Sequence, residues 1–141
     1  MNTNPFASGC LGMTPEALNS LFDLSDVTLP FWGYRKAMPM HKIVRLEGEG
    51  NYTLFHFSDG TRLMVSLTLK KMAARLAPGV FARPHKKNIV NMLYMEETHP
   101  SRQQHTVQLS NGDRIEVSRR KASGFFRQFN RFQQRMQEGV N

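Results

Sequence analysis

The stretch Phe81-Ala-Arg-Pro-His-Lys-Lys-Asn-Ile-Val-Asn91 places a basic cluster between two apolar anchors. Phe81 at one end and Ile89-Val90 at the other are typical of a packed core. The cations between them cannot go inside, since an unpaired charge is costly to remove from water. We therefore expect the basic residues to form a displayed tip on a rigid scaffold, where binding residues usually lie.

The charge around this stretch is asymmetric. Over the whole chain the formal net charge is +8, and all 19 Lys and Arg residues lie after residue 34. Such a balance favours a polyanionic partner, with nucleic acid first and an anionic membrane surface second. The interval between Asp59 and Glu96 contains no acid and seven cations: Arg62, Lys70, Lys71, Arg75, Arg83, Lys86 and Lys87.

Length and composition limit the class of protein. A chain of 141 residues indicates one domain with a short appendage and a core of its own. Cys10 is the only cysteine, so we expect neither a disulfide framework nor a zinc-binding cysteine cluster. Without a long apolar run or a signal-peptide pattern, the protein is expected to be cytoplasmic. The five histidines lack metal-binding spacing, and the acids show no catalytic pairing. We expect no metal, no cofactor and no enzymatic activity.

The N-terminal part differs from the rest in composition. Thr14-Pro15-Glu16 is typical of a helix start, and the apolar residues that follow predict a short helix ending near Phe22. A second apolar patch, over residues 27–34, is interrupted by a proline and a glycine. Two interpretations stay open for this acidic arm. It packs on the domain, or it serves self-association or the docking of a regulatory partner.

From His41 onward the pattern predicts many short strands and two helices. Ser58-Asp-Gly60 and Ser110-Asn-Gly-Asp113 are typical hairpin turns. Pro84 places residues 81–83 at a sheet edge, because proline has no N–H for a central ladder. Residues 67–76 predict a short amphipathic helix, for which Ser66 is a cap candidate. Strands are expected at 43–46, 52–57, 62–66, 81–83, 89–90, 92–95, 106–109 and 114–117.

A second helix is predicted from about residue 119 to residue 136. Its apolar stripe is formed by Ala122, Phe125, Phe126, Phe129, Phe132 and Met136. The first turn carries Arg119, Arg120 and Lys121, although cations there oppose the helix dipole by roughly 0.3–1 kcal/mol each. This arrangement favours contact with phosphates or base edges. A solvated charge run is the alternative.

The sequence thus predicts three displayed tips: Ser66 with the basic helix after it, His85-Lys86-Lys87-Asn88, and Arg119–Lys121. Within the middle tip, the lysines suit phosphates, whereas His85 and Asn88 either donate to bases or hold the turn.

Two other functions remain open. One is an RNA-binding β-domain in which Tyr52, Phe55 and Phe57 stack on bases, although their alternation fits a core better. The other is a membrane-surface or partner-binding module.

Taken together, these residues resemble the LytTR DNA-binding domain family over about residues 38–132. The resemblance begins with Ile43-Val-Arg-Leu-Glu47 and Tyr52, then Asp59-Gly60, then Ser66-Leu67 before a short helix. Its most specific parts are Phe81-x-Arg83-x-His85-Lys86-x-x-Ile89-Val90-Asn91 and Val107-x-Leu109-x-Asn111-Gly112-x-x-Ile115-x-Val117-Ser118-Arg119.

The resemblance implies a mainly β, elongated fold of small antiparallel sheets, with a short middle helix and a C-terminal helix. It also implies a sequence-specific, double-stranded DNA-binding transcriptional regulator of bacterial type. Its basic loops would read successive major grooves and the minor groove between them, with two copies on paired direct repeats. We expect an N-terminal arm over residues 1–37 and the DNA-binding domain over residues 38–137.

Family members often carry a phosphoreceiver domain before the DNA-binding domain. The roughly 34 residues before the basic part are too few for a domain. We therefore expect a stand-alone, response-regulator-like member, controlled by abundance, by a partner or by the arm, and able to form a homodimer.

Carried over by position, the resemblance implies base contacts by Ser66, Lys86 and Arg119. Ser66 departs from family members that have a longer polar residue at this position. The neighbouring side chains are expected to contact the DNA backbone or to support the tips: Lys70, Arg83, His85, Lys87, Asn88, Arg120 and Lys121.

Overall fold

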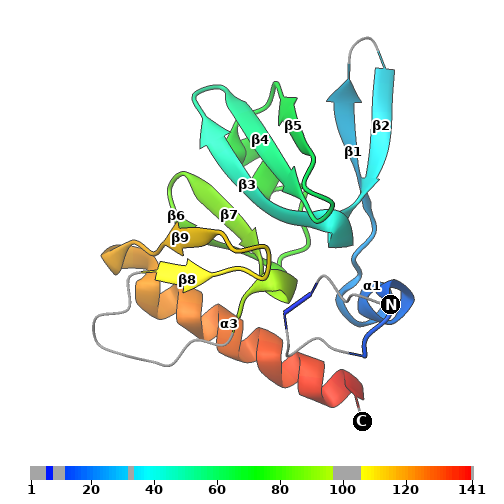
Figure 1. Cartoon of the computed structure of the whole chain (residues 1–141), viewed down its shortest axis with the longest axis vertical. Helices are drawn as coiled ribbons and strands as arrows, with labels where there is room; N and C mark the ends of the chain where they lie inside the picture. Colours follow the sequence, from blue (N-terminus) through cyan, green and yellow to red (C-terminus); the bar gives the residue numbers. More distant parts are fainter. Residues whose placement is uncertain (1–5, 8–11, 32–33, 97–105, 141) are drawn as a thin grey trace.

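The structure is a computed structural model that describes residues 6–7, 12–31, 34–96 and 106–140 (Figure 1). The helices are α1 (Pro15–Phe22), α2 (Leu69–Ala73) and α3 (Arg119–Val140), with 3-10 helices at Met40–Lys42 and Met92–Tyr94. The strands are β1 (Asp26–Phe31), β2 (Tyr34–Pro39), β3 (Ile43–Glu49), β4 (Tyr52–Phe57), β5 (Arg62–Val65), β6 (Phe81–His85), β7 (Asn88–Asn91), β8 (Thr106–Gln108) and β9 (Arg114–Glu116).

The strands form three antiparallel sheets. The largest has the order β5-β4-β3-β7-β6, and the other two are the hairpins β1–β2 and β8–β9. In Figure 1, α3 runs beneath β6 and the β8–β9 hairpin and reaches α1 at its far end. The expected mainly β fold of small antiparallel sheets with a middle and a C-terminal helix is confirmed.

The centre of the large sheet follows directly from the apolar pattern. Ile43, Val44 and Leu46 of β3 are fully buried, as expected of a strand with neighbours on both sides. Both predicted hairpin turns are present, between β4 and β5 and between β8 and β9. Gly60 and Gly112 have φ of 89° and 96°, the region that favours glycine in tight turns.

Strand β6 lies at the edge of the sheet, as the proline predicted. Its register with β7 is irregular between Ala82 and His85, around the buried Pro84. His85 pairs with Asn88, so Lys86 and Lys87 form a two-residue turn between β6 and β7. Residues 81–91 therefore form a hairpin with a basic tip.

The prediction of a strand over Met92–Met95 is wrong. Residues Met92–Tyr94 form a 3-10 helix, and only Met95 makes a bridge, to Leu109. The reason lies in the buried Asn91, whose side chain accepts from the Leu93 N–H at 2.9 Å and donates to the Ile43 carbonyl at 2.8 Å. A continuous apolar run cannot distinguish a buried strand from a buried turn.

The middle helix is shorter than predicted, and its cap is a different residue. Helix α2 covers Leu69–Ala73 only, and Thr68 is its N-cap, with a side chain that accepts from the Lys71 N–H at 3.2 Å. Ser66 does not cap the helix and lies exposed in the turn between β5 and α2.

The apolar patch over residues 27–34 contributes to a hairpin that the sequence did not predict. Strand β1 pairs with β2 from Asp26–Pro39 to Phe31–Tyr34, and residues 32–33 are outside the described part. Val27 and Leu29 are buried while Thr28 and Pro30 are exposed, so the patch has strand alternation despite its proline. Pro30 is tolerated because a two-stranded ribbon consists of edge strands.

The predicted N-terminal helix is present as α1 and packs against the far end of α3. Thr14 caps it by accepting from the Ala17 N–H at 3.1 Å. Phe22 stacks on Phe132 with ring centroids 5.2 Å apart, and the Arg135 guanidinium donates to the Leu21 carbonyl at 2.9 Å.

Candidate nucleic-acid interface

One edge of the molecule brings the three predicted tips together. The Gly48 N–H at the end of β3 donates to the Lys87 carbonyl at 2.8 Å, and α2 contacts both β3 and β7, so close to Gly48 that a Cβ added there would lie 3.5 Å from Leu69. These contacts join the start of α2, which follows Ser66, to the Lys86–Lys87 turn. In Figure 1 the tips follow one another along the side where β3 ends and α3 begins.

The third tip is attached to the second by the backbone. The Ser118 N–H, immediately before α3, donates to the Pro84 carbonyl of β6 at 2.8 Å. Across the same junction, His85 Nε2 lies 3.8 Å from a carboxylate oxygen of Glu116. Arg119 directly follows Ser118, whose backbone is hydrogen-bonded to β6, the strand that leads into the Lys86–Lys87 turn.

The side chains on this edge are mostly free to reach a partner. We call this surface the basic edge and define it as Ser66, Lys70, Lys86, Lys87, Arg119, Arg120 and Lys121. All seven side chains are exposed except that of Lys121, which is half-buried.

The other three predicted site residues hold the middle tip. Arg83 donates to the Lys86 carbonyl at 2.6 Å, and His85 Nδ1 accepts from the Lys87 N–H at 3.2 Å. Asn88 accepts from Arg45 at 3.2 Å. Each of the three supporting side chains is half-buried, in line with the turn-holding interpretation of His85 and Asn88. They fix the turn and leave the two lysines exposed.

Arg45 is a supporting residue that the sequence analysis missed. From β3 its Nε donates to Asp113 in the β8–β9 turn at 2.9 Å, and its Nη1 lies 3.5 Å from Glu47. Together with the bond to Asn88 of β7, one side chain joins the large sheet to the β8–β9 hairpin that leads into α3. A cation within the apolar run Ile43–Leu46 was the available signal, since a charge there needs partners.

Asp113 forms an ion pair with Arg45. Burial would raise the pKa of Asp113, but hydrogen bonds from Arg45 and Asn111 and the charge of Arg45 outweigh it and keep the pKa below its ordinary value of 3.8. The Asp113 carboxylate is therefore ionised at neutral pH and paired, although its side chain is 35% exposed.

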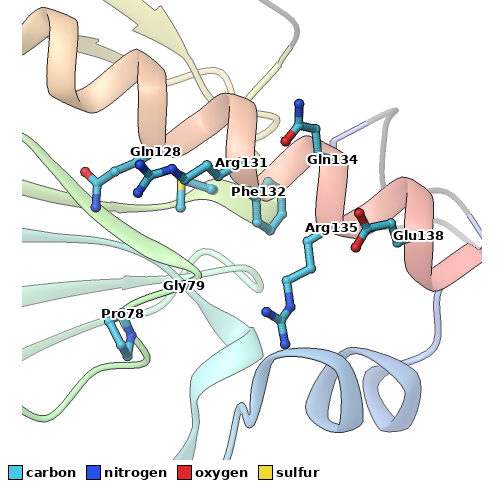
Figure 2. Close-up of a pocket in the computed structure, with 9 residues that line it drawn as sticks. Pro78, Gly79, Gln128, Arg131, Phe132, Gln134, Arg135 and Glu138 are labelled. Atoms are coloured by element: carbon cyan, nitrogen blue, oxygen red, sulfur yellow. The ribbon is translucent and has the colours of Figure 1, made fainter.

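One cavity lies away from the basic edge. It has a volume of about 400 Å³ and is formed by the distal half of α3 and the Pro78-Gly79 turn (Figure 2). Figure 2 shows the side chain of Arg135, one of the lining residues, pointing towards α1. None of its lining residues belongs to the predicted site, and no cluster of metal-ligating side chains occurs among the residues that the structure describes.

The aromatic residues of the RNA alternative do not form a stacking surface. Phe55 and Phe57 are buried, whereas Tyr52 is 50% exposed. The core interpretation was therefore right for the two phenylalanines and wrong for Tyr52, which lies beside the β3–β4 turn. Single-strand binding by stacking needs several accessible rings, and of these three rings only that of Tyr52 is accessible.

Within the described ranges, no helix is long and apolar enough to cross a membrane.

Comparisons with known proteins agree with this geometry. A family profile described as the LytTr DNA-binding domain matches residues 35–130. Among solved structures, a LytTr DNA-binding domain from Bacillus cereus is similar, with 25% identity and a TM-score of 0.61. The similarity covers 74% of this chain and 95% of that one. No curated protein sequence matches significantly. The chain therefore belongs to the LytTR family and carries its DNA-binding domain.

Proposed function

We propose that the protein regulates transcription by sequence-specific binding of double-stranded DNA through the basic edge. The observation that carries this proposal is the convergence of three exposed tips on one edge: α2 and the Lys86–Lys87 turn both contact the end of β3 at Gly48, and a backbone hydrogen bond from Ser118 to Pro84 joins the start of α3 to β6. A rigid row of cations suits a duplex, whose phosphates repeat along a rigid rod.

Arg119 is the main base-reading residue in this proposal. Its guanidinium fork matches the O6 and N7 acceptors of guanine in the major groove. The residue is exposed at the first position of α3, and the backbone before it is bonded to β6. A fixed backbone supports specificity, because a bidentate contact depends on the direction from which the side chain arrives.

Lys86 and Ser66 complete the base contacts. Lys86 extends from a turn that Arg83 and His85 hold, and it enters or borders the minor groove between two major grooves. Ser66 reaches the next major groove from the turn before α2. Its short hydroxyl donates or accepts a single bond, so it discriminates least between bases.

The remaining cations of the basic edge contact phosphates. Lysine and arginine contacts to phosphate fix register but carry no sequence information. The proposed contacts are Lys70, Lys87, Arg120 and Lys121.

The proposed DNA site is a pair of direct repeats that binds two copies of the chain. Selection of bound sequences from a random double-stranded pool, at about 150 mM salt to suppress non-specific attraction, tests the proposal. We expect a short motif repeated at about one helical turn, the spacing at which two protomers meet the same face of DNA. Binding without an enriched motif would contradict sequence reading.

Replacing Arg119 with alanine should weaken binding to the selected site by about 1–3 kcal/mol and relax the preference at one base pair. Lys121→Ala is the matched control on the same helix turn. It should weaken all sequences alike and lower the slope of log K against log salt by about one. Titrations on specific and random duplexes measure both effects, and an equal loss for Arg119→Ala on the two duplexes would refute its base-reading role.

A further inference from the structure

The hairpin β1–β2 lies beside the large sheet, next to the end of the basic edge that carries Ser66. Strand β1 contacts β5, the edge strand that leads into Ser66. In Figure 1, β1 and β5 point in the same direction, so the end of β1 and the end of β5 lie on the same side of the molecule. The hairpin is thus placed to extend the row of tips beyond Ser66.

The distal part of this hairpin is positively charged. Arg35 and Lys36 are exposed near the start of β2, in register with Pro30 and Leu29 of β1. No acid occurs in residues 27–40, and Asp26 lies at the opposite end of the ribbon, paired with Pro39. The charged residues that the hairpin itself contributes near this end are therefore cations.

A side chain also links the hairpin to the basic helix. The Arg75 guanidinium, just after α2, lies 3.5 Å from the Thr28 carbonyl of β1. In the chain, the exposed Lys70 and Lys71 of α2 come between the turn at Ser66 and Arg75. The segment that contacts the hairpin therefore carries exposed cations of its own.

We propose that the β1–β2 hairpin is a fourth DNA-contacting element, in which Arg35 and Lys36 bind phosphates beyond the segment met by Ser66. This inference rests on the proposed function and lengthens its contact with DNA. The contacts are to phosphate, because a ribbon that displays two neighbouring cations presents no fixed donor and acceptor pattern to base edges. Cations on an exposed edge strand also hinder strand pairing between molecules, a role that needs no DNA.

The double variant Arg35→Gln/Lys36→Gln tests the inference. On a duplex that carries one copy of the selected motif and long flanks, so that one protomer binds, we expect the salt slope to fall by about 1.8, since each lost phosphate contact contributes about 0.9. At about 150 mM salt this corresponds to a loss of roughly 10–30-fold in affinity if counterion release dominates. The selected motif itself should not change.

Flank length identifies where the contact is made. Two further duplexes are each shortened by about half a turn, one at either end of the site. On the duplex that lacks the contacted flank, the affinity of the wild type should fall to that of the double variant. On the other duplex, the wild type should still bind more tightly than the double variant. Lys42→Gln/Arg131→Gln removes the same charge from exposed positions away from the basic edge and should leave the salt slope unchanged.

Other outcomes overturn the inference. Equal affinity and equal salt slope of wild type and double variant on every duplex would show that the hairpin does not contact DNA. Self-association of the double variant with unchanged DNA binding would assign the cations to edge protection. In both cases the wild type still selects a motif, so the proposed function stands. A wild type that binds no DNA overturns both proposals.

Discussion

Replacing Arg45 with methionine is expected to lower the free energy of unfolding by about 2–3 kcal/mol. Loss of one partner from a fully buried ion pair costs about 3–5 kcal/mol, because the other charge stays without compensation. The expected loss is smaller here because Asp113 and Glu47 are 35% and 33% exposed and water solvates them in part. Chemical denaturation of the wild type and the variant measures the difference.

The matched control is Arg62→Met, the same substitution on β5. The Arg62 side chain is exposed and forms no hydrogen bond or ion pair with any residue that the structure describes, so its replacement should change stability by less than about 0.5 kcal/mol. Equal losses for the two variants would mean that the Arg45 cluster contributes no more than a surface charge does.

The stability difference between wild type and Arg45→Met should depend on pH. The folded-state pKa of Asp113 is depressed, so the stabilisation that its ionised form gives is complete above the unfolded value near 3.8 and is lost as the pH falls through the folded value. The two proteins should therefore differ most at neutral pH and converge in acid. If the stability difference stays constant down to the acid transition, the ionisation of Asp113 does not account for the stabilisation that Arg45 provides.

DNA binding should respond to Arg45→Met although Arg45 does not belong to the basic edge. The side chain holds Asn88, directly after the Lys86–Lys87 turn, and Asp113, in the hairpin that leads to Arg119. Loosening both tips should reduce affinity for the selected site more than affinity for random DNA. The reason is that base contacts need fixed geometry, whereas phosphate contacts tolerate movement.

The sequence predicted those parts of the fold that local chemistry determines. The two turns with a glycine at positive φ, the edge strand before Pro84 and the apolar stripe of α3 each depend on neighbours in the chain. The prediction was wrong where a contact with a residue far away in the sequence determines the local structure. Met92–Tyr94 is a 3-10 helix because Asn91 bonds to Ile43, 48 residues away in the sequence.

The same distinction between local patterns and distant contacts applies to the candidate site. Exposed cations in basic runs were found because charge patterns are visible in one dimension. Arg45 was missed because its role depends on Asn88 and Asp113, 43 and 68 residues away in the sequence. The β1–β2 hairpin was missed because residues 27–34 contain a proline and a glycine, and their partner strand has few apolar residues to mark it.

Replacing Phe22 with alanine should lower the free energy of unfolding by about 3–5 kcal/mol, the usual cost of truncating a buried phenylalanine. Phe22 is 8% exposed, stacks on Phe132 and lies 5.7 Å from the Arg135 guanidinium above its ring. The full cost appears only if α1 and the rest of the domain unfold together. We expect this because Leu18 of α1 is fully buried and Leu21 contacts Gly139 of α3.

Phe22→Leu is the control, because it keeps an apolar side chain, leaves a smaller cavity and should therefore cost less than Phe22→Ala. DNA affinity of both variants should equal that of the wild type wherever they are folded, since Phe22 packs on the end of α3 opposite to Arg119. If Phe22→Ala instead exposes residues 1–37 to proteases while the main unfolding transition does not move, the arm is a separate unit. That outcome would favour its role as a partner-docking segment over a structural one, because a segment that detaches at little cost is free to bind elsewhere.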